Sequence, residues 1–550
     1  MTSSSPPIQP KEIRSVVFRR GDFMGFKISN FFRTSVTKAA VFCALAACGQ
    51  KNIVDQRGRQ ISSSAGDAVD NSAATNGSQT GSDANTSRPK SRVLPLVDKT
   101  FAVAGVSRQA ISSIDVKIND FVVLPDGGIM AVGSKANAPS IPYSFPPALN
   151  TNPHEFIVMR LTKDGALDSS FGERVTGGSP QSTDRRGYSS YSITGSTDSR
   201  GYRIALESNG NFLVAGTYGA GSGFALLRIS ADGTLQSTFG ANGIVMSPCP
   251  SGGASVSGLV RTSSKIVLAG TCLKSPRTGQ AEIPHIRLAV LSPVDGAVDT
   301  FASTFHLIDG KPSTTFDALL VNDKFYIAGS VEMPDPTIAS NPGVHHQMVL
   351  RFKDDATLDT SFGINGAAII SDGSAIGAVL ALVASSDGAN VVAIGMSKRT
   401  TGNVTRETAT AWSIPYNYRG ANDSVCFAAM GGTANFVPFS AALDVNGKIL
   451  VSGSLRRAGA GFAMAAFQLG PSSTVSGACR PVIASAGDQS DAQSSIAFAE
   501  YPRTAQHEFI RKIIMIPGSN GRAMMAGGVS YNNSGDRGAF FTRLKLDENL

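Results

Sequence analysis

The chain has 550 residues, 58 glycines, one tryptophan, only 16% charged residues and a formal net charge of +8. This composition is typical of short strands joined by tight turns and argues against a mainly helical protein. Most of the positive charge lies in residues 1–95, which carry thirteen Lys/Arg against six Asp/Glu, so residues 96–550 are nearly neutral. A nearly neutral body lacks the basic surface that binds phosphate backbones, which excludes nucleic acid as a partner.

An export signal is the first element that we expect. Arg33 and Lys38 form a short basic region, and an apolar run follows at residues 39–47. Nine apolar residues are too few to span a bilayer, but they suit the central part of a signal peptide. The start of the chain therefore predicts export.

The apolar run ends in L-A-A-C-G, which resembles a bacterial lipobox. That resemblance implies cleavage before Cys48 and a diacylglycerol on its thiol, so we interpret residues 1–47 as the signal peptide. Met24 would give a signal of ordinary length, which makes residues 1–23 candidates for a misassigned start. The alternative is an ordinary secretory signal followed by a chance cysteine.

Residues 48–95 read as a polar tether. Residues 62–91 are mostly Ser, Ala, Asn, Asp, Gly and Thr. Such a segment cannot bury enough apolar surface to offset its ordering entropy, so we expect it to be disordered. A lipidated Cys48 and this tether would hold a folded body off a membrane. By resemblance to Gram-negative lipoproteins, Gly49 after the cysteine favours the outer membrane.

The body of the chain repeats one segment. The sequence R-L-T-K-D-G-A-L-D-S-S-F-G at residues 160–172 returns as R-I-S-A-D-G-T-L-Q-S-T-F-G at 228–240. It returns again as R-F-K-D-D-A-T-L-D-T-S-F-G at 351–363, and a worn copy lies at 291–301. Self-similarity over tens of residues indicates a repeat architecture.

Each unit begins with a hairpin of two apolar strands, as at residues 121–133 and 204–216. Asp-Gly or Asn-Gly lies at the turn of several of these hairpins, which is a strong hairpin signal. A third apolar strand follows, and the D-G and L-D-x-S-F-G segment leads to a fourth. A glycine that ends the second strand marks seven units: Gly133, Gly216, Gly270, Gly329, Gly395, Gly453 and Gly527.

The two ends of the body complement each other. The last unit has no S-F-G segment, whereas V-D-K-T-F-A-V-A-G at residues 97–105 is an orphan copy of it. In a closed ring, one blade can be completed by both termini, and closure removes exposed strand edges. We predict an all-β fold, a β-propeller of seven four-stranded blades over residues 96–550. Six or eight blades are the alternatives, because the repeats are degenerate over residues 371–500.

The phrase D-G-x-L-D-x-S-F-G-x-x-G with its I-x-V-A-G hairpin resembles the Delta-60 repeat family of bacterial exported proteins. The resemblance is best at residues 121–172, 203–246 and 316–370, and it implies a β-propeller but no activity. Two departures are clear: Gln236 replaces the Asp of the second copy, and Ala356 replaces the D-G glycine of the third.

Charged residues recur at fixed places in the repeat. The arginines are Arg160, Arg228, Arg351 and Arg543, and the aspartates are Asp98, Asp168, Asp299 and Asp359. They could form a ring of ligand contacts, but a catalytic residue is needed once and not once per blade, so we favour a structural role. The repeated Asp-Gly pairs could bind calcium, but no D-x-D-x-D-G run occurs and turn chemistry explains them. We expect neither a metal nor a cofactor.

The histidines give no catalytic or metal pattern. They are His154, His285, His306, His345, His346 and His507, with no H-E-x-x-H spacing. We place His345 and His346 in the loop before a third strand and Trp412 in a blade core. No G-x-S-x-G or P-loop motif appears either, so we assign no catalytic residue.

Four cysteines remain after the signal and the lipidation site: Cys249, Cys272, Cys426 and Cys479. Four cysteines allow three pairings, and proximity in the sequence favours Cys249–Cys272 and Cys426–Cys479. An oxidising compartment would permit these disulfides, and free buried thiols are the alternative.

The function that we expect is that of a membrane-anchored binding or scaffolding module for a protein or glycan partner. Function concentrates on loops held by a rigid fold, and the long insertions at residues 139–153 and 334–344 are the first candidates. The alternative is a propeller enzyme, a hydrolase or lyase with its site at the central channel. That alternative predicts carboxylates or histidines with shifted pKa values converging in one pocket.

Overall fold

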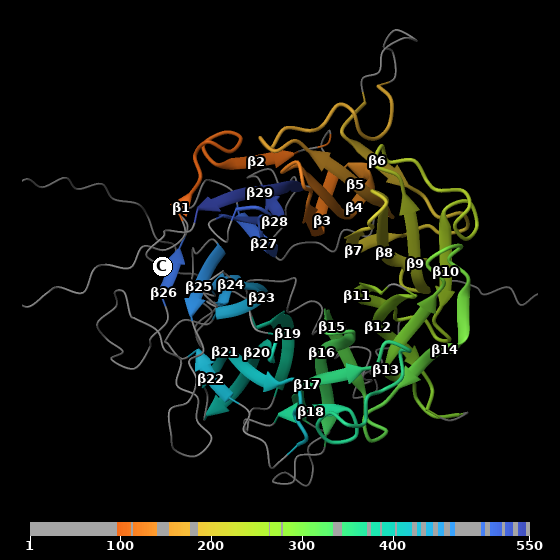
Figure 1. The fold of residues 1–550 in the computed structure, drawn as a ribbon, viewed down its shortest axis with the longest axis vertical. Coiled ribbons are helices and arrows are strands. Elements are labelled where there is room, and N and C mark those ends of the chain that lie inside the picture. The colour runs from red at the N-terminus through yellow and green to blue at the C-terminus, as the bar shows by residue number, and fades with distance from the viewer. Residues whose placement is uncertain are drawn as a thin grey trace, which may run out of the picture.

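A computed structural model gives the fold. It describes residues 96–139, 153–175, 185–333, 344–467 and 497–545, apart from short gaps within these ranges. Every regular element among these residues is a β-strand, and the strands are arranged in sheets around a circle (Figure 1). None of the described residues forms a helix able to cross a membrane. The fold is an all-β propeller.

Four sheets have four antiparallel strands each, and the chain completes one sheet before it starts the next. The first contains β3 (Ile114–Val123), β4 (Ile129–Pro139), β5 (His154–Leu161) and β6 (Tyr188–Tyr191). The second contains β7 (Arg200–Leu206), β8 (Phe212–Tyr218), β9 (Gly223–Ile229) and β10 (Ile244–Pro248). The third contains β11 (Ser255–Arg261), β12 (Ile266–Lys274), β13 (Ile283–Leu291) and β14 (Val298–His306). The fourth contains β23 (Phe436–Leu443), β24 (Ile449–Leu455), β25 (Phe462–Phe467) and β26 (Ala497–Glu500).

A larger sheet of eight strands lies between the third and the fourth of these. Its first half contains β15 (Ser313–Val321), β16 (Lys324–Met333), β17 (Val344–Phe352) and β18 (Ala367–Ile370). Its second half contains β19 (Ile376–Ala384), β20 (Asn390–Thr401), β21 (Val404–Pro415) and β22 (Cys426–Met430). Each half is antiparallel, and one parallel pair, His345 with Ile376, joins them. The described strands thus form six hydrogen-bonded sheets, and this count does not confirm the predicted seven blades.

The remaining sheet closes the ring with strands from both ends of the described chain. It contains β27 (His507–Met515), β28 (Ala523–Tyr531) and β29 (Arg537–Lys545), with β1 (Leu96–Val97) and β2 (Val106–Gln109) both paired to β29. Arg543 Nε donates to Asp98 Oδ2 at 2.8 Å, and Thr542 Oγ1 donates to the Gly105 carbonyl at 2.9 Å. The orphan motif at the start of the body therefore completes the last unit, as the complementary ends predicted.

The core lies between the sheets. Neighbouring sheets stack face to face, so their second and third strands are covered on both sides and are mostly apolar. β9, for example, is buried at every residue. The first strands surround the centre in the order β3, β7, β11, β15, β19, β23 and β27, and β27 neighbours β3 again (Figure 1).

Candidate functional site

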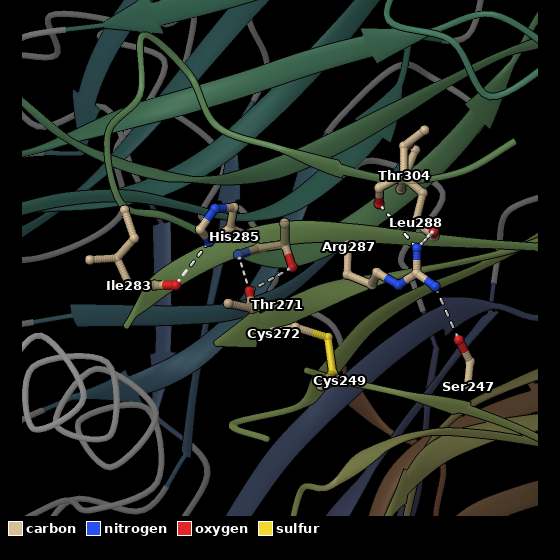
Figure 2. The surroundings of a disulfide bond; sticks show 10 residues. Ser247, Cys249, Thr271, Cys272, Ile283, His285, Arg287, Leu288 and Thr304 are labelled. Atoms are coloured by element: carbon tan, nitrogen blue, oxygen red, sulfur yellow. Dashed lines mark hydrogen bonds between the residues drawn. A yellow bond between two sulfur atoms is a disulfide. The ribbon is translucent and has the colours of Figure 1, made fainter. Parts of the chain in front are cut away.

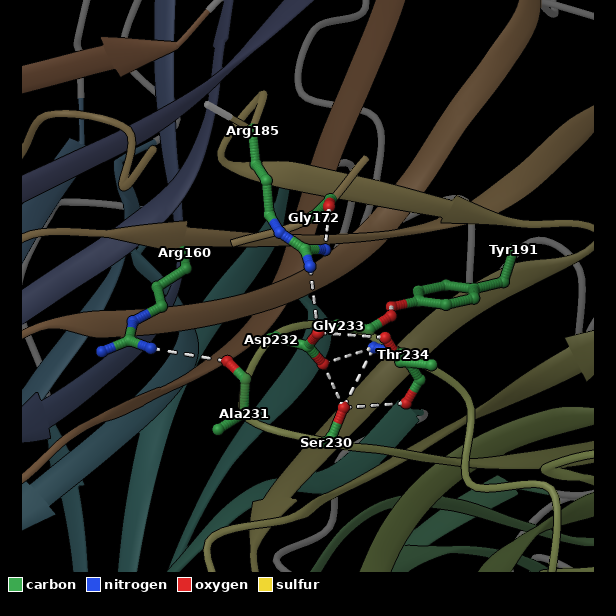
Figure 3. Close-up of polar contacts among 9 residues, drawn as sticks. All are labelled: Arg160, Gly172, Arg185, Tyr191, Ser230, Ala231, Asp232, Gly233 and Thr234. Atoms are coloured by element: carbon green, nitrogen blue, oxygen red, sulfur yellow. Dashed lines mark hydrogen bonds and ion pairs between the residues drawn. The ribbon is translucent and has the colours of Figure 1, made fainter. Parts of the chain in front are cut away.

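The repeated motif ties each sheet to the next one. Gly172 is the glycine of the S-F-G segment. Its backbone N donates to the carbonyl of Asp232 in the next sheet at 3.0 Å. Arg160 Nη1 donates to the neighbouring Ala231 carbonyl at 3.4 Å (Figure 3). Arg185 adds an ion pair to the Asp232 carboxylate at 3.2 Å (Figure 3). The S-F-G segment of one repeat therefore docks on the D-G turn of the following repeat.

Arg160 and the three arginines at the same place in the other repeats, which we call the ring arginines, make the same kind of connection. Arg228 Nη1 donates to Val294 O at 3.1 Å, Arg543 Nη1 to Lys163 O at 3.4 Å, and Arg351 Nη1 to Tyr416 O. The acceptors of Arg228 and Arg543 belong to the sheet that follows, and the acceptor of Arg351 belongs to the second half of the eight-stranded sheet. The structural role that we favoured for these arginines is therefore the role they have where one set of four strands meets the next.

Carboxylates hold these arginines in place. Arg160 Nε lies 2.9 Å from Asp168 Oδ2, and Arg351 Nε lies 3.0 Å from Asp359 Oδ2. The pKa of Asp98, the partner of Arg543, is low. Burial alone would raise it, but hydrogen bonds from Thr100 and Lys545 and the charge of Arg543 outweigh burial. The predicted Arg–Asp positions thus form charge pairs that belong to the fold.

In the second repeat, the arginine also pairs with a carboxylate, but this carboxylate belongs to a glutamate outside the motif. Gln236 stands where the other copies have Asp, and Glu207 from the preceding hairpin takes over. Arg228 Nε donates to Glu207 Oε2 at 2.6 Å, and Nη2 donates to Oε1 at 2.5 Å. Sequence reasoning missed Glu207, because it lies 21 residues before its partner and outside the motif.

The Ala356 departure belongs to a junction of another kind. Val290 stands at the arginine position of sheet β11–β14, and Lys265 Nζ instead donates to Asp355 O at 3.4 Å. Ala356 is 1% exposed, with φ of 66°.

Polar groups on the first strands link the sheets at the centre. Asp120 Oδ2 accepts from Ile204 N at 3.1 Å, and Asp317 Oδ2 accepts from Leu382 N at 3.0 Å. Arg203 Nε donates to the Ser257 carbonyl at 2.7 Å. These central carboxylates accept hydrogen bonds from backbone amides of the next set of four strands. Among the described residues, no group of three His, Cys, Asp or Glu side chains could hold a metal ion.

All six histidines lie at one edge of their sheets. His154, His285, His345, His346 and His507 lie within the first three residues of a first or third strand, and His306 ends a fourth strand. In an antiparallel sheet, first and third strands begin where fourth strands end. We call this edge the loop edge and the opposite edge, which carries the D-G turns, the motif edge. His345 and His346 belong to β17, so their placement in a loop was wrong.

The long insertions leave from the loop edge as well. One connects β4 to β5 and ends just before His154, and the other connects β16 to β17 and ends just before Val344. The residues inside these insertions, 140–152 and 334–343, lie outside the described part of the chain. Two histidine-bearing strands thus begin where the two predicted contact loops end.

His154 is the buried centre of a partly exposed charged cluster at this edge. Its Nδ1 lies 3.3 Å from Asp198 Oδ1 and 3.4 Å from Arg200 Nη2. Arg200 also donates to both Asp198 oxygens, at 3.2 and 3.1 Å. Burial, reinforced by the charge of Arg200 and opposed by Asp198, lowers the pKa of His154 to about 4. The imidazole is therefore neutral at pH 7.

His154 has the surroundings of a general base, but solvent does not reach it. The other ring nitrogen of His154, Nε2, is buried and has no hydrogen-bond partner in the part of the chain that the structure describes. An imidazole with one nitrogen beside a carboxylate and the other unpartnered is the arrangement of a general base. His154 is only 3% exposed, however, so a substrate in solvent does not reach Nε2 in this arrangement.

The cysteines give one disulfide among the described residues. Cys249, in the loop after β10, is bonded to Cys272 in β12, with 5.5 Å between the Cα atoms (Figure 2). This predicted pair joins two neighbouring sheets. Cys426 lies in β22, but its predicted partner Cys479 lies outside the described residues, as does Cys48 with its signal and tether.

Trp412 lies in the core, as expected. It is 3% exposed and packs between the two halves of the eight-stranded sheet. Its Nε1 donates to Oε1 of the buried Gln347 at 2.9 Å. A ligand-stacking role is therefore not available to it in this structure.

No family model and no curated protein matches the chain. Among solved structures, a protein of unknown function from Dyadobacter fermentans is similar at 10% identity, covering 62% of this chain and 93% of that one (TM-score 0.37). Drosophila semaphorin 2a is similar at 8% identity, covering 82% and 76% (TM-score 0.42). Penicillium chrysogenum α-L-arabinanase complexed with arabinobiose is similar at 11% identity, covering 63% and 93% (TM-score 0.38). Likeness at this level identifies no function for this chain.

Proposed function

We propose that this protein is an exported lipoprotein of the Delta-60 repeat type, anchored to the outer membrane through Cys48. Its body is a seven-bladed propeller that binds a protein or glycan partner at the loop edge. The observation that supports the binding role is a structural difference between the two edges of the propeller. The repeated charges form hydrogen bonds and ion pairs at the motif edge, whereas both insertions that we predicted as contact loops leave from the loop edge.

Two features support seven blades. The eight-stranded sheet consists of two antiparallel sets of four, joined by only one parallel pair. The first strands of all sets, with these two counted separately, follow one another around the centre from β3 to β27 and back to β3. A blade is defined by such a first strand, so the eight-stranded sheet counts as two blades.

The position of Leu96 supports an anchor on the side away from the loops. Leu96 pairs with Lys545, the last residue of β29, which is a third strand and therefore ends at the motif edge. A tether that joins the body there is attached at the edge opposite the loop edge. This placement leaves residues 140–152 and 334–343 free to meet a partner.

The binding role is tested with the full chain expressed in a Gram-negative host. Residues 140–152 or 334–343 are replaced by Gly-Ser linkers of equal length, and binding is measured on purified bacterial glycans and by cross-linking to envelope proteins. Replacing a contact loop should abolish binding, while Val103→Ser, a change at an 83% exposed residue of the motif edge, should not. Undiminished binding by both loop variants would contradict the proposal.

The anchor is tested separately by mass spectrometry of the purified chain. We expect a mature protein that begins at diacylated Cys48, and a Cys48→Ser variant that carries no lipid. An unprocessed chain would overturn the lipoprotein part of the proposal. It would leave the binding test at the loop edge unaffected.

The second candidate is a propeller hydrolase or lyase. His154 favours it, because its Nε2 has no partner among the described residues and Asp198 lies beside the other ring nitrogen. On this hypothesis, His154→Gln abolishes turnover of a glycan that the wild type cleaves, with binding retained. Retention of turnover in that variant would exclude His154 as the base.

A further inference from the structure

Two of the ring arginines, Arg228 and Arg543, donate hydrogen bonds to side-chain oxygen atoms from the same side of the guanidinium group. Nε and Nη2 lie on one side of the group and form a fork that suits an oxyanion. Arg228 gives both nitrogens to Glu207, at 2.6 and 2.5 Å. Arg543 gives Nε to Asp98 at 2.8 Å and Nη2 to the Thr100 hydroxyl at 3.1 Å. At each of these two arginines, the fork receives a carboxylate from the chain.

Arg287 in β13 is a buried arginine whose fork receives no carboxylate from any described residue. Its side chain is 9% exposed, and Nη1 is taken by the Leu288 carbonyl at 2.9 Å and the Thr304 carbonyl at 3.4 Å. On the other side, and counting described residues alone, Nη2 has only the Ser247 hydroxyl, at 3.3 Å, and Nε has no hydrogen-bond partner. Figure 2 shows this open edge of the guanidinium turned toward Ser247 and the disulfide.

The surroundings of Arg287 add positive charge. The Lys274 ammonium lies 4.6 Å from the centroid of the Phe305 ring, and the Arg287 guanidinium lies 4.5 Å from it. Burial lowers the pKa of Arg287. A buried cation without a counter-ion is unfavourable, because its lost hydration is replaced only by neutral acceptors. This place between sheets β7–β10 and β11–β14 therefore favours an anion.

We propose that Arg287 and Ser247 form a binding site for a small oxyanion, namely a carboxylate, sulfate or phosphate group. Nε and Nη2 donate a pair of hydrogen bonds to it, and the Ser247 hydroxyl donates a third. The ligand takes the place that Glu207 takes at Arg228. The site lies beside the Cys249–Cys272 disulfide, and it does not depend on the proposed role of the loop edge.

The test uses the full-length, oxidised protein in isothermal titration at constant ionic strength. Sodium phosphate, sulfate, acetate and glucuronate are compared with chloride, so that a free inorganic ion and the carboxylate of a sugar acid are distinguished. We expect saturable binding of at least one oxyanion. Arg287→Lys, which keeps the charge but loses the fork, should weaken it at least tenfold. Ser247→Ala should weaken it several-fold, since one donor is lost.

Arg160→Lys is the matched control, because Asp168 already lies 2.9 Å from its Nε. This variant should bind the oxyanion as the wild type does. Cooperative thermal unfolding of each variant shows that it is folded. The proposal is overturned if the wild type shows no saturable binding beyond chloride, or if Arg287→Lys binds as tightly as the wild type.

Discussion

The ring of Phe171 packs directly over Gly233 of the next sheet, and a Cβ on that glycine would lie 3.0 Å from Cζ of the ring. Phe101 and Gly165 stand in the same relationship, at 2.8 Å. The two halves of the repeat motif, S-F-G and D-G, therefore fit each other across every such junction. Glycine is required at this position for two reasons. The φ angle at Gly233 is +92°, and the Phe171 ring leaves no room for a side chain.

Gly233→Ala should lower the free energy of unfolding by about 2–4 kcal/mol, through left-handed strain and overpacking against Phe171. Urea unfolding followed by the fluorescence of Trp412, the single tryptophan, measures the loss. Gly210→Ala is the control: φ is +85°, but nothing lies within 4 Å of the added Cβ. It should cost only the strain, about 1 kcal/mol. Equal losses in the two variants would show that the contact with Phe171 does not matter.

Asp98→Asn should weaken the closure of the ring by about 1–3 kcal/mol at pH 7, because it removes the charge that pairs with Arg543 and Lys545. The folded-state pKa of Asp98 is lowered, so its stabilisation is present above the ordinary carboxyl value of about 4. That stabilisation is lost as the pH falls further. The gap between wild type and variant should therefore narrow in acid, as measured by urea unfolding at several pH values.

An exposed aspartate serves as the control for this closure. Asp295→Asn changes a carboxylate on the motif edge that has no cationic partner among the described residues. We expect it to change stability by less than about 0.5 kcal/mol. If Asp98→Asn is equally mild, the two chain ends are not held together by this pair.

His154 should make stability depend on pH between about 6.5 and 4. Its pKa is lowered to about 4 in the folded protein, so the unfolded chain takes up the proton first. Stability is then fully present above pH 6.5 and falls as the pH drops, by about 3 kcal/mol at most. In His154→Gln, the slope of unfolding free energy against pH should decrease by up to one proton. An unchanged slope would mean that His154 is not buried as a neutral group.

Removing the disulfide should be costly. Cys249 and Cys272 are 23 residues apart, and closing a loop of that length stabilises a folded chain by about 3 kcal/mol in the chain-entropy treatment. The double variant Cys249→Ser/Cys272→Ser should lose about that much in urea unfolding. Peptide mapping without reductant checks the bond, and free thiols at both cysteines would contradict it. The same map tests the predicted Cys426–Cys479 pair.

The strand pattern and the closure were predictable because both are written in local sequence. Apolar runs separated by D-G and N-G turns mark hairpins, and the orphan motif at residues 97–105 matches the segment that the last unit lacks. The number of blades was harder, since the repeats degrade after residue 371. The partner of Arg228 was not predictable, because Glu207 replaces the missing motif aspartate from another turn.

The candidate sites depended on packing between sheets. Nothing in the sequence sets Arg287 apart from the repeated arginines except that it lies outside the motif. Only the folded arrangement leaves its fork without a carboxylate from the described residues. The cluster of His154, Asp198 and Arg200 likewise joins residues 44 to 46 positions apart.

The sequence by itself determined the repeat, the all-β class and the complementary ends, because turn chemistry and the alternation of apolar residues act over a few neighbouring positions. The tertiary structure decided which charges meet. A blade's arginine is paired within its own sheet but reaches a carbonyl of the next, as Arg160 reaches Ala231. An arginine side chain links two sheets when the neighbouring sheet places an acceptor within hydrogen-bond distance, and it is left as a candidate binding site when the sheet places none there. Which of the two occurs depends on how the sheets are arranged in the closed ring.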